Sequence, residues 1–79
     1  MPERLKTGEK LVGSKQTKKA IREGRAKTVF IARDADSFVT SPIQDLAAQS
    51  GVEIVFVPSM KELGECCGVE VATACAVLL

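Results

Sequence analysis

Two short, uninterrupted apolar runs constrain the fold of this chain more than any other feature. They are residues 29–32, with the sequence VFIA, and residues 54–57, with the sequence IVFV. Runs of this length without alternation are typical of strands that are covered on both faces, as in a sheet flanked by helices. The sequence therefore predicts an α/β fold, and its 79 residues allow one small domain, residues 1–79.

A first helix is predicted over residues 15–23. Ser14 can serve as its N-cap, no helix breaker interrupts it, and Gly24 stands where a left-handed residue ends a helix. A strand is then expected over residues 28–33, because the first apolar run lies within them. The pattern therefore predicts that only residues 24–27 separate this helix from this strand.

The outer segments of the chain have weaker patterns. Residues 3–9 either form a short polar helix or remain loose, and Leu11 and Val12 are a brief apolar pair that ends at Gly13. At the other end of the chain, residues 74–79 are apolar enough to form a last strand. The expected order of elements is therefore an alternation of helices and strands, without internal repeats.

Two further helices are predicted. Thr40 or Ser41 can cap the first of them, with Pro42 at its first helical position and Gly51 at its end. Its apolar stripe, at i, i+3 and i+4, consists of Ile43, Leu46 and Ala47.

The last helix begins with a capping box, Ser59 followed three residues later by Glu62. Leu63 is predicted to face inward, and Gly68 to end the helix. The second apolar run, residues 54–57, is predicted to form a buried strand just before this helix.

Composition argues against an enzyme. The chain has no His, Trp or Tyr, so most proton-shuttle and imidazole-metal mechanisms are excluded. Its cysteines, Cys66, Cys67 and Cys75, are odd in number and have no C-x-x-C spacing, which predicts neither a disulfide framework nor a zinc site. We interpret them as small buried side chains, and we expect no cofactor and no metal.

Two other groups of residues are interpreted as structural. Asp34 and Asp36 could form a Mg²⁺ site, but a third ligand and a base are not evident, so turn and helix-capping roles are favoured. The three phenylalanines are too dispersed for a base-stacking platform, and Phe30 and Phe56 are assigned to the core.

The net charge of +1 conceals a strong asymmetry. Residues 1–33 carry ten Lys and Arg against three Glu, a net charge of +7, whereas residues 34–79 carry one Lys against seven acidic side chains, a net charge of −6. Such asymmetry is typical of proteins with a polyanionic partner, because local potential rather than net charge steers association.

The most informative segment is residues 13–22, with the sequence GSKQTKKAIR. At 100° per residue its four cations fall within about one 100° arc, and they are Lys15, Lys18, Lys19 and Arg22. Like charges at this spacing repel each other, and cations near a helix N-terminus oppose the macrodipole. Both penalties become advantages if a phosphate backbone lies there, although a solvated, Lys-rich helix remains the alternative.

The segments GSKQTKKAIREGRAK, VFIARDAD and VEIVFVPSMKELGECCGVEVATACAVLL together resemble the ribosomal protein L-seven-Ae and L-thirty-e family of kink-turn RNA-binding proteins. The resemblance covers roughly residues 11–79 and is closest to the short bacterial members. It implies a three-layer α-β-α sandwich around a four-stranded mixed sheet. The implied ligand is a kink-turn, a bulge beside tandem sheared G·A pairs that bends the RNA sharply.

The resemblance also implies the roles of the residues in the motif. Gly13 and Ser14 would approach the RNA backbone at the start of the helix. Lys15 and Gln16 would address the G·A pairs, since guanine O6 and N7 accept hydrogen bonds, and Lys19 would reach a guanine or its phosphate.

Two further candidates, Lys18 and Arg22, come from the helical face rather than from the motif. Archaeal family members commonly carry Asn-Glu where this chain has Lys15-Gln16, whereas bacterial and L-thirty-e-like members share Lys-Gln. This departure concerns the base preference and the individual base contacts, not RNA binding itself.

A second implied RNA-binding segment is residues 68–73, GVEVAT, which resembles the loop that covers the bulged nucleotides in the family. Val69, Val71 and Ala72 would shelter an unstacked base. Without the resemblance, Val69 and Val71 are ordinary residues at the entry to a strand. A carboxylate near phosphates is unfavourable unless it accepts from a base or pairs with a Lys, and Glu70 is expected to form a salt bridge with the basic helix.

Two functions of different classes follow from these patterns. The favoured one is an RNA-binding, ribosome-associated module that recognises kink-turns in ribosomal or regulatory RNA. The alternative is a protein-interaction domain of the same fold that binds a basic partner with its acidic half, residues 34–70. Because no signal sequence or membrane-spanning run is present, a cytoplasmic protein without membrane contact is expected. The protein is also expected to be a monomer.

Overall fold

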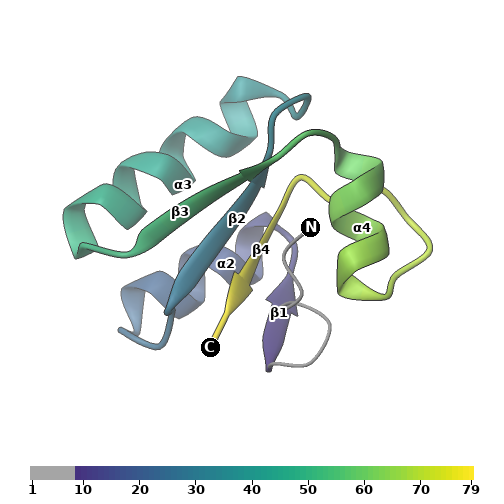
Figure 1. Cartoon of the computed structure of the whole chain (residues 1–79). Helices are drawn as coiled ribbons and strands as arrows, with labels where there is room; N and C mark the ends of the chain where they lie inside the picture. The colour runs from purple at the N-terminus through teal and green to yellow at the C-terminus, as the bar shows by residue number, and fades with distance from the viewer. Residues whose placement is uncertain (1–8) are drawn as a thin grey trace.

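Helices and strands alternate along the chain in the computed structural model, which describes residues 9–79 (Figure 1). The elements are β1 (Lys10–Val12), α2 (Ser14–Arg22), β2 (Thr28–Ala32), α3 (Ser37–Ser50), β3 (Glu53–Val57), α4 (Met60–Cys67) and β4 (Cys75–Leu78). This order confirms the predicted α/β class. The two alternatives for residues 3–9 lie almost entirely outside the described residues.

The four strands form one mixed sheet with the order β1-β4-β2-β3. Strands β2 and β3 are parallel, and β4 is antiparallel to both of its neighbours, β1 and β2. As a result, β1, β2 and β3 all end at the side of the sheet where β4 begins. We call this side, with the segments that leave or enter the strands there, the loop end of the sheet.

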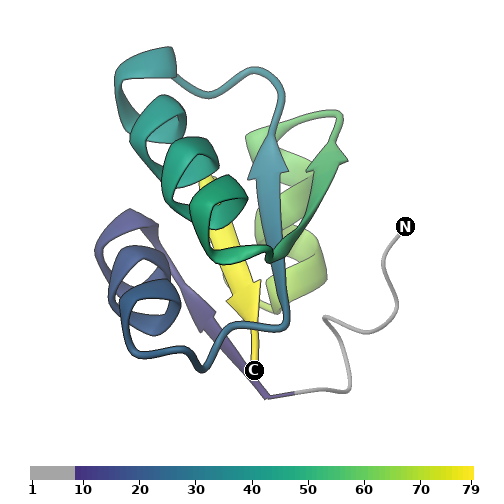
Figure 2. The same ribbon diagram turned by 90° about the vertical axis from the view of Figure 1, so that its left-hand side faces the viewer.

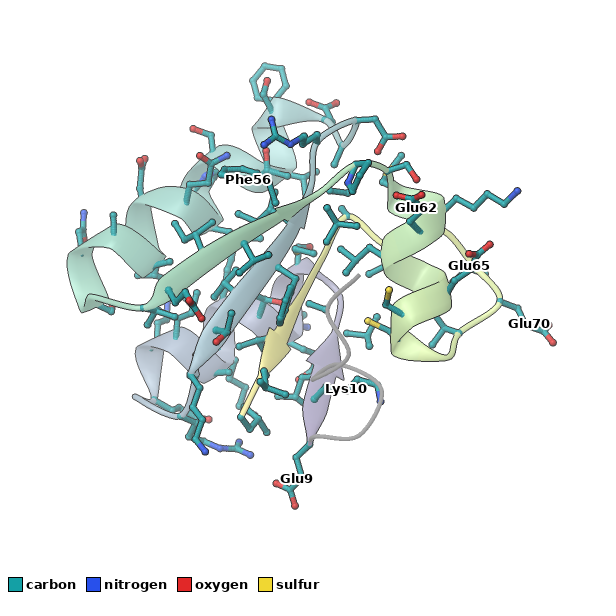
Figure 3. The ribbon with its side chains drawn as sticks, viewed as in Figure 1. Glu9, Lys10, Phe56, Glu62, Glu65 and Glu70 are labelled. Carbon is teal, nitrogen blue, oxygen red and sulfur yellow. The ribbon has the colours of Figure 1, made fainter. Side chains whose placement is uncertain are left out.

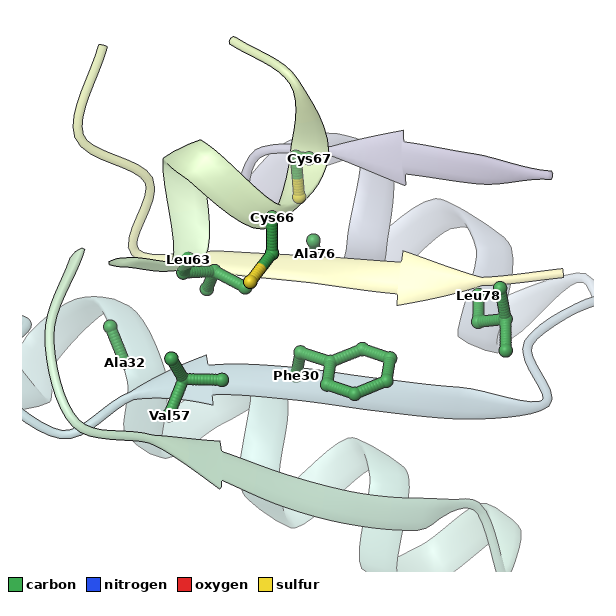
Figure 4. Close-up of a cluster of buried hydrophobic side chains, with 8 residues drawn as sticks. All are labelled: Phe30, Ala32, Val57, Leu63, Cys66, Cys67, Ala76 and Leu78. Atoms are coloured by element: carbon green, nitrogen blue, oxygen red, sulfur yellow. The ribbon is translucent and has the colours of Figure 1, made fainter. Parts of the chain in front are cut away.

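The sheet separates two helical layers, which confirms the predicted three-layer sandwich with a four-stranded mixed sheet (Figure 2). On one side, α2 and α3 pack over a cluster of buried residues that includes Val29, Ile31 and Val77. On the other side, α4 packs over a cluster centred on Phe30 (Figure 4). Because successive side chains of a strand point to opposite faces, β2 and β4 contribute to both clusters.

The start of α2 differs from the prediction. Gly13 and not Ser14 is the N-cap, and no side chain forms a capping hydrogen bond there. The Gly13 N–H donates to the Cys75 carbonyl at 3.0 Å, so ladder pairing with β4 continues up to the residue before the helix. The end of α2 agrees with the prediction, since Gly24 has a left-handed φ of 72°.

Helix α3 begins earlier than predicted. Its N-cap is Asp36, whose carboxylate accepts a hydrogen bond from the Phe38 N–H at 2.9 Å, so the predicted caps Thr40 and Ser41 are wrong. Pro42 therefore lies inside the helix and not at its first position. The prediction failed because Asp36 is a stronger cap four residues upstream. The predicted end at Gly51 is confirmed, with φ 69°.

Helix α4 is capped twice at its N-terminus. The Ser59 hydroxyl accepts from the Glu62 N–H at 3.1 Å, which confirms that half of the predicted capping box. The Asp34 carboxylate, from the segment after β2, accepts from the Met60 N–H at 2.8 Å. Asp34 and Asp36 are thus both helix-capping residues, as interpreted from the sequence, and Asp34 ties α4 to the loop end of the sheet.

The strand β3 is less buried than predicted. It is an edge strand that pairs only with β2, and most of its residues are partly or fully exposed. Phe30 lies in the core with 0% exposure, as predicted, but Phe56 is 43% exposed, so its assignment to the core is wrong. The Arg33 guanidinium covers the Phe56 ring at 5.2 Å from its centroid, which shields part of this aromatic surface.

The three cysteines are free and buried, as predicted. Burial raises the pKa of the Cys67 thiol, against a smaller opposing effect of Lys10. Burial likewise raises the pKa of the Cys75 thiol, opposed by the Thr17 hydroxyl and Lys18. Both thiols therefore keep their protons at a pH at which an exposed cysteine ionises.

The raised pKa values predict a pH-dependent stability. Above about pH 8.5, unfolded thiols ionise while the buried ones do not, so unfolding releases protons and the free energy of unfolding falls as pH rises. Each thiol contributes a slope of at most about 1.4 kcal/mol per pH unit. Urea unfolding at pH 7.5, 8.5 and 9.5 measures this decline, which should be shallower in Cys75→Ala. An equal decline in the variant would contradict the assignment to Cys75.

Candidate functional site

The exposed side of α2 carries the four cations that the sequence placed together. They lie along one open depression, whose lining is Ser14, Lys15, Lys18, Lys19, Arg22 and Glu23. The opposite side of the helix is buried through Thr17, Ala20 and Ile21. The predicted grouping of cations is therefore confirmed as geometry, and we call Lys15, Lys18, Lys19 and Arg22 the basic face of α2.

Gln16 has a different position from the cations. It is exposed but is not among the residues that line the depression. A helix turns about 100° per residue, so Gln16 lies on the flank of the helix next to Lys15. The two residues of the predicted Lys-Gln pair thus point in different directions, and together they cover a wider arc than the basic face alone.

The N-terminus of α2 is open to a ligand because of Gly13. This residue has φ 105° and ψ 155°, a conformation that strains any residue with a side chain, and a Cβ atom there would meet open space. The Gly13 carbonyl accepts from the N–H and the hydroxyl of Thr17, at 3.0 and 2.8 Å. Since no side chain caps the helix, its first-turn N–H groups face outward beside Ser14 and Lys15.

The second predicted segment forms a loop between α4 and β4. Glu70, Val71 and Ala72 are exposed, with Val71 at 69%, while Val69 is half-buried and packs against the α4 side of the core. Val69 and Val71 are therefore loop residues, and β4 begins only at Cys75. Figure 3 shows Glu70 projecting outward from this loop.

The expected salt bridge between Glu70 and the basic helix is wrong. Within residues 9–79, Glu70 forms no ion pair with α2, and the acidic partner near that helix is Glu23 at its C-terminal end, which pairs with Arg25 at 3.4 Å. The physical reason is placement, since Glu70 leaves the loop on the side of α4, which lies across the sheet from α2 (Figure 3).

Hydrogen bonds at the loop end of the sheet bring these segments together. The Gly13 N–H donates to the Cys75 carbonyl at 3.0 Å, and the Ala32 N–H donates to the Ala74 carbonyl at 2.9 Å. The last residues of the loop are therefore fixed between the N-cap of α2 and the end of β2. The loop thus enters β4 beside the N-cap of α2, so the two predicted parts of the site, far apart in sequence, lie at the same end of the sheet.

Two residues outside the predicted site hold this arrangement in place. Asp34 caps α4, which agrees with its predicted capping role, whereas Gly64 was missed and lies in the middle of α4 with the loop packed directly against it. A glycine inside a predicted helix is a signal of close backbone approach, and the LGECCG segment contained that signal. What the glycine approaches was not visible in the sequence, because it depends on the path of the loop.

Other kinds of site receive no support from the described part of the chain. Among residues 9–79, no three His, Cys, Asp or Glu side chains gather in a way that could hold a metal ion. None of the helices in that range has the length and apolar character needed to cross a bilayer.

Comparisons with known proteins identify one matching family model and several similar proteins. A family model described as the ribosomal protein L7Ae/L30e/S12e/Gadd45 family matches residues 1–79. An RNA-binding protein from Bacillus pumilus is 41% identical over 69 residues, which are 87% of this chain and 84% of that protein. A second RNA-binding protein, from Caldanaerobacter subterraneus, is 40% identical over 67 residues, or 85% of this chain and 82% of that protein.

Longer relatives share the same core. The large ribosomal subunit protein eL8 of Halobacterium salinarum is 39% identical over 74 residues, which cover 92% of this chain but 62% of that protein. The solved structure of the Giardia lamblia 15.5kD RNA binding protein superimposes with a TM-score of 0.90 at 30% identity, over 96% of this chain and 68% of that one.

None of these relatives is named as an enzyme, in agreement with the expectation from composition. Both the sequence matches and the shared fold extend over the basic face of α2 and the loop before β4. The chain therefore belongs to the ribosomal protein L7Ae/L30e/S12e/Gadd45 family.

Proposed function

We propose that this protein binds RNA and that it recognises and stabilises kink-turns, in ribosomal or regulatory RNA. The observation that carries the proposal is an uncapped, basic helix N-terminus whose N-cap, Gly13, is hydrogen-bonded to Cys75, the residue at which the exposed apolar loop enters β4. Relatives named as RNA-binding proteins, at 40% identity and above over most of their length, support the RNA-binding part.

The first half of the proposed site combines charge with hydrogen-bond donors. Phosphates would bind to the first-turn N–H groups of α2, beside Gly13 and Ser14, and to the basic face, where Lys18 and Arg22 extend the contact. Sheared G·A pairs in a sharply bent duplex expose guanine edges that an ordinary RNA helix hides. Lys15, Lys19 and Gln16 supply donors for guanine O6 and N7.

The second half of the proposed site is the loop between α4 and β4. The exposed Val71 and Ala72, with Val69 behind them, offer an apolar surface to a nucleotide that is displaced from the stack. Glu70 is free of any ion pair with α2 and is therefore available to accept a hydrogen bond from a base N–H. A bend that brings an unstacked nucleotide close to tandem G·A pairs would engage both halves at once.

We further propose that residues 1–79 act as one RNA-binding domain, as a monomer in the cytoplasm and in association with the ribosome. Neither half of the site requires a cofactor or a metal ion. The acidic side chains of residues 34–67, outside both halves of the site, would repel RNA from other parts of the molecule and so favour a single orientation on the ligand.

A gel shift with two RNA duplexes tests this function. One duplex contains a kink-turn, and the other differs only in that its sheared G·A pairs are replaced by Watson–Crick pairs. We expect the protein to bind the kink-turn duplex at least about tenfold more tightly, because specific contacts add 1–3 kcal/mol each to the charge attraction that both duplexes share. Equal affinities for the two duplexes would refute kink-turn recognition.

A further inference from the structure

Helix α4 contains a buried glycine, Gly64, that does not stabilise the helix itself. Glycine is among the poorest helix formers, yet Gly64 lies in the interior of α4 with ordinary helical geometry. The reason is contact with the loop. A Cβ atom at Gly64 would collide with the carbonyl oxygen of Val71 and would lie 3.3 Å from the carbonyl carbon of that residue. Only a glycine lets the loop backbone approach so closely.

The loop is tied to α4 on both sides of this contact. The Val69 N–H donates to the Gly64 carbonyl at 3.0 Å, and the Thr73 N–H donates to the Met60 carbonyl at 3.0 Å. The Thr73 hydroxyl, in a buried side chain, donates to the Val71 carbonyl at 3.4 Å. The loop therefore runs back along α4 from its end toward its start, and Gly64 lies where it comes nearest.

This packing determines the orientation of Val71. Its carbonyl is turned onto α4 at Gly64, while its side chain is 69% exposed. The loop cannot sink further, because the helix backbone is in contact with it, and Ala74 is fixed to the end of β2 by a hydrogen bond of 2.9 Å. The close approach of the loop to α4 at Gly64 thus sets the position of Val71 relative to the N-terminus of α2.

We propose that Gly64 is a positioning residue for RNA selectivity, which holds Val71 at the distance from α2 that a kink-turn requires. This inference rests on the proposed function. Gly64 itself is buried beneath the loop, so its effect passes through the loop. The basic face of α2, which supplies the general attraction to phosphates, lies in the opposite helical layer and does not depend on it (Figure 2).

The test is Gly64→Ala, measured with the kink-turn duplex and the Watson–Crick control. We expect the ratio of the two affinities to fall about tenfold, as for the partial loss of one base contact, while affinity for the control stays within about twofold. A purely structural defect would lower both affinities alike. Glu65→Ala, the neighbouring exposed position of the same helix, is the matched variant and should keep the wild-type ratio.

A second variant guards against a failure of Gly64→Ala to fold. Thr73→Val keeps the volume of the side chain but removes the hydroxyl that holds the Val71 carbonyl, and it should lower the ratio about threefold. In amide NMR spectra, either variant should shift the signals of residues 69–73 and leave those of α2 in place. If Gly64→Ala does not fold, the ratio for Thr73→Val decides.

The outcomes separate the two proposals. If the wild-type protein binds both duplexes equally, the proposed function fails and this inference fails with it. If the wild type discriminates between them and the folded variants keep its ratio, the positioning role alone is overturned. If the ratio falls while control binding persists, the positioning role of Gly64 is supported.

Discussion

Replacement of Lys15 by alanine is expected to weaken binding to a kink-turn RNA by about 1–3 kcal/mol, and to reduce the preference over a Watson–Crick control by a similar amount. Lys15 lies in the first turn of α2, beside the free N–H groups that Gly13 leaves uncapped. Its ammonium group is exposed and lines the basic depression. Gln16→Ala is expected to behave in the same way, because we assign its amide to the base edges as well.

Lys18→Ala is the matched variant for this experiment. It also removes one positive charge from the basic face. Unlike Lys15, however, Lys18 is assigned to contacts with phosphates and not with bases. Binding should weaken by similar factors for both duplexes, and the slope of log affinity against log salt concentration should fall by about one. Titrations of both duplexes at several salt concentrations provide these values. If Lys18→Ala lost selectivity and Lys15→Ala did not, the assigned roles would be reversed.

The largest expected effect on stability comes from Phe30→Ala, at about 3–5 kcal/mol. Phe30 is fully buried in the middle of β2, and Figure 4 shows its ring between the sheet and α4, among Leu63, Cys66 and Leu78. Truncation removes most of this packing and leaves a cavity, because the hydrogen-bonded strands around it cannot easily move together to fill the space. Since small domains have total stabilities of about 5–15 kcal/mol, the variant will be close to unfolding. Urea denaturation of wild type and variant measures the difference.

Phe56→Ala removes the same side chain from the edge strand and serves as the control. Phe56 is 43% exposed, and its ring contacts Arg33 rather than the core. The loss should stay near 1 kcal/mol, because much of the ring surface is hydrated in the folded state. Similar losses for the two variants would show that burial does not distinguish these positions.

Local patterns in the sequence were sufficient for the presence of the three helices, for their C-terminal ends and for the basic face. The spacing of Lys15, Lys18, Lys19 and Arg22 depends only on the period of one helix, and the glycines that end the helices need only a left-handed φ. For the same reason the capping role of Ser59 could be predicted from four consecutive residues. The resemblance to a family then supplied the sheet and its layers.

What could not be predicted depends on which strands are neighbours. Phe30 and Phe56 lie in apolar runs of equal length, and only the sheet order, with β2 inside and β3 at the edge, distinguishes them. Gly13 was missed as the N-cap because its N–H is bound by a residue of β4, far along the chain. The role of Gly64 likewise depends on the path of a loop that no local rule predicts.

The position of β4 in the sheet has a kinetic consequence. This strand is last in sequence but lies between β1 and β2, and Lys10 pairs with Leu78, so the closing contacts span nearly the whole described chain. Such long-range pairing forms slowly compared with helices and local turns. The same strand fixes the N-cap of α2 and the end of the loop. We therefore expect the proposed discrimination among RNAs to be acquired only late in folding, when β4 enters the sheet.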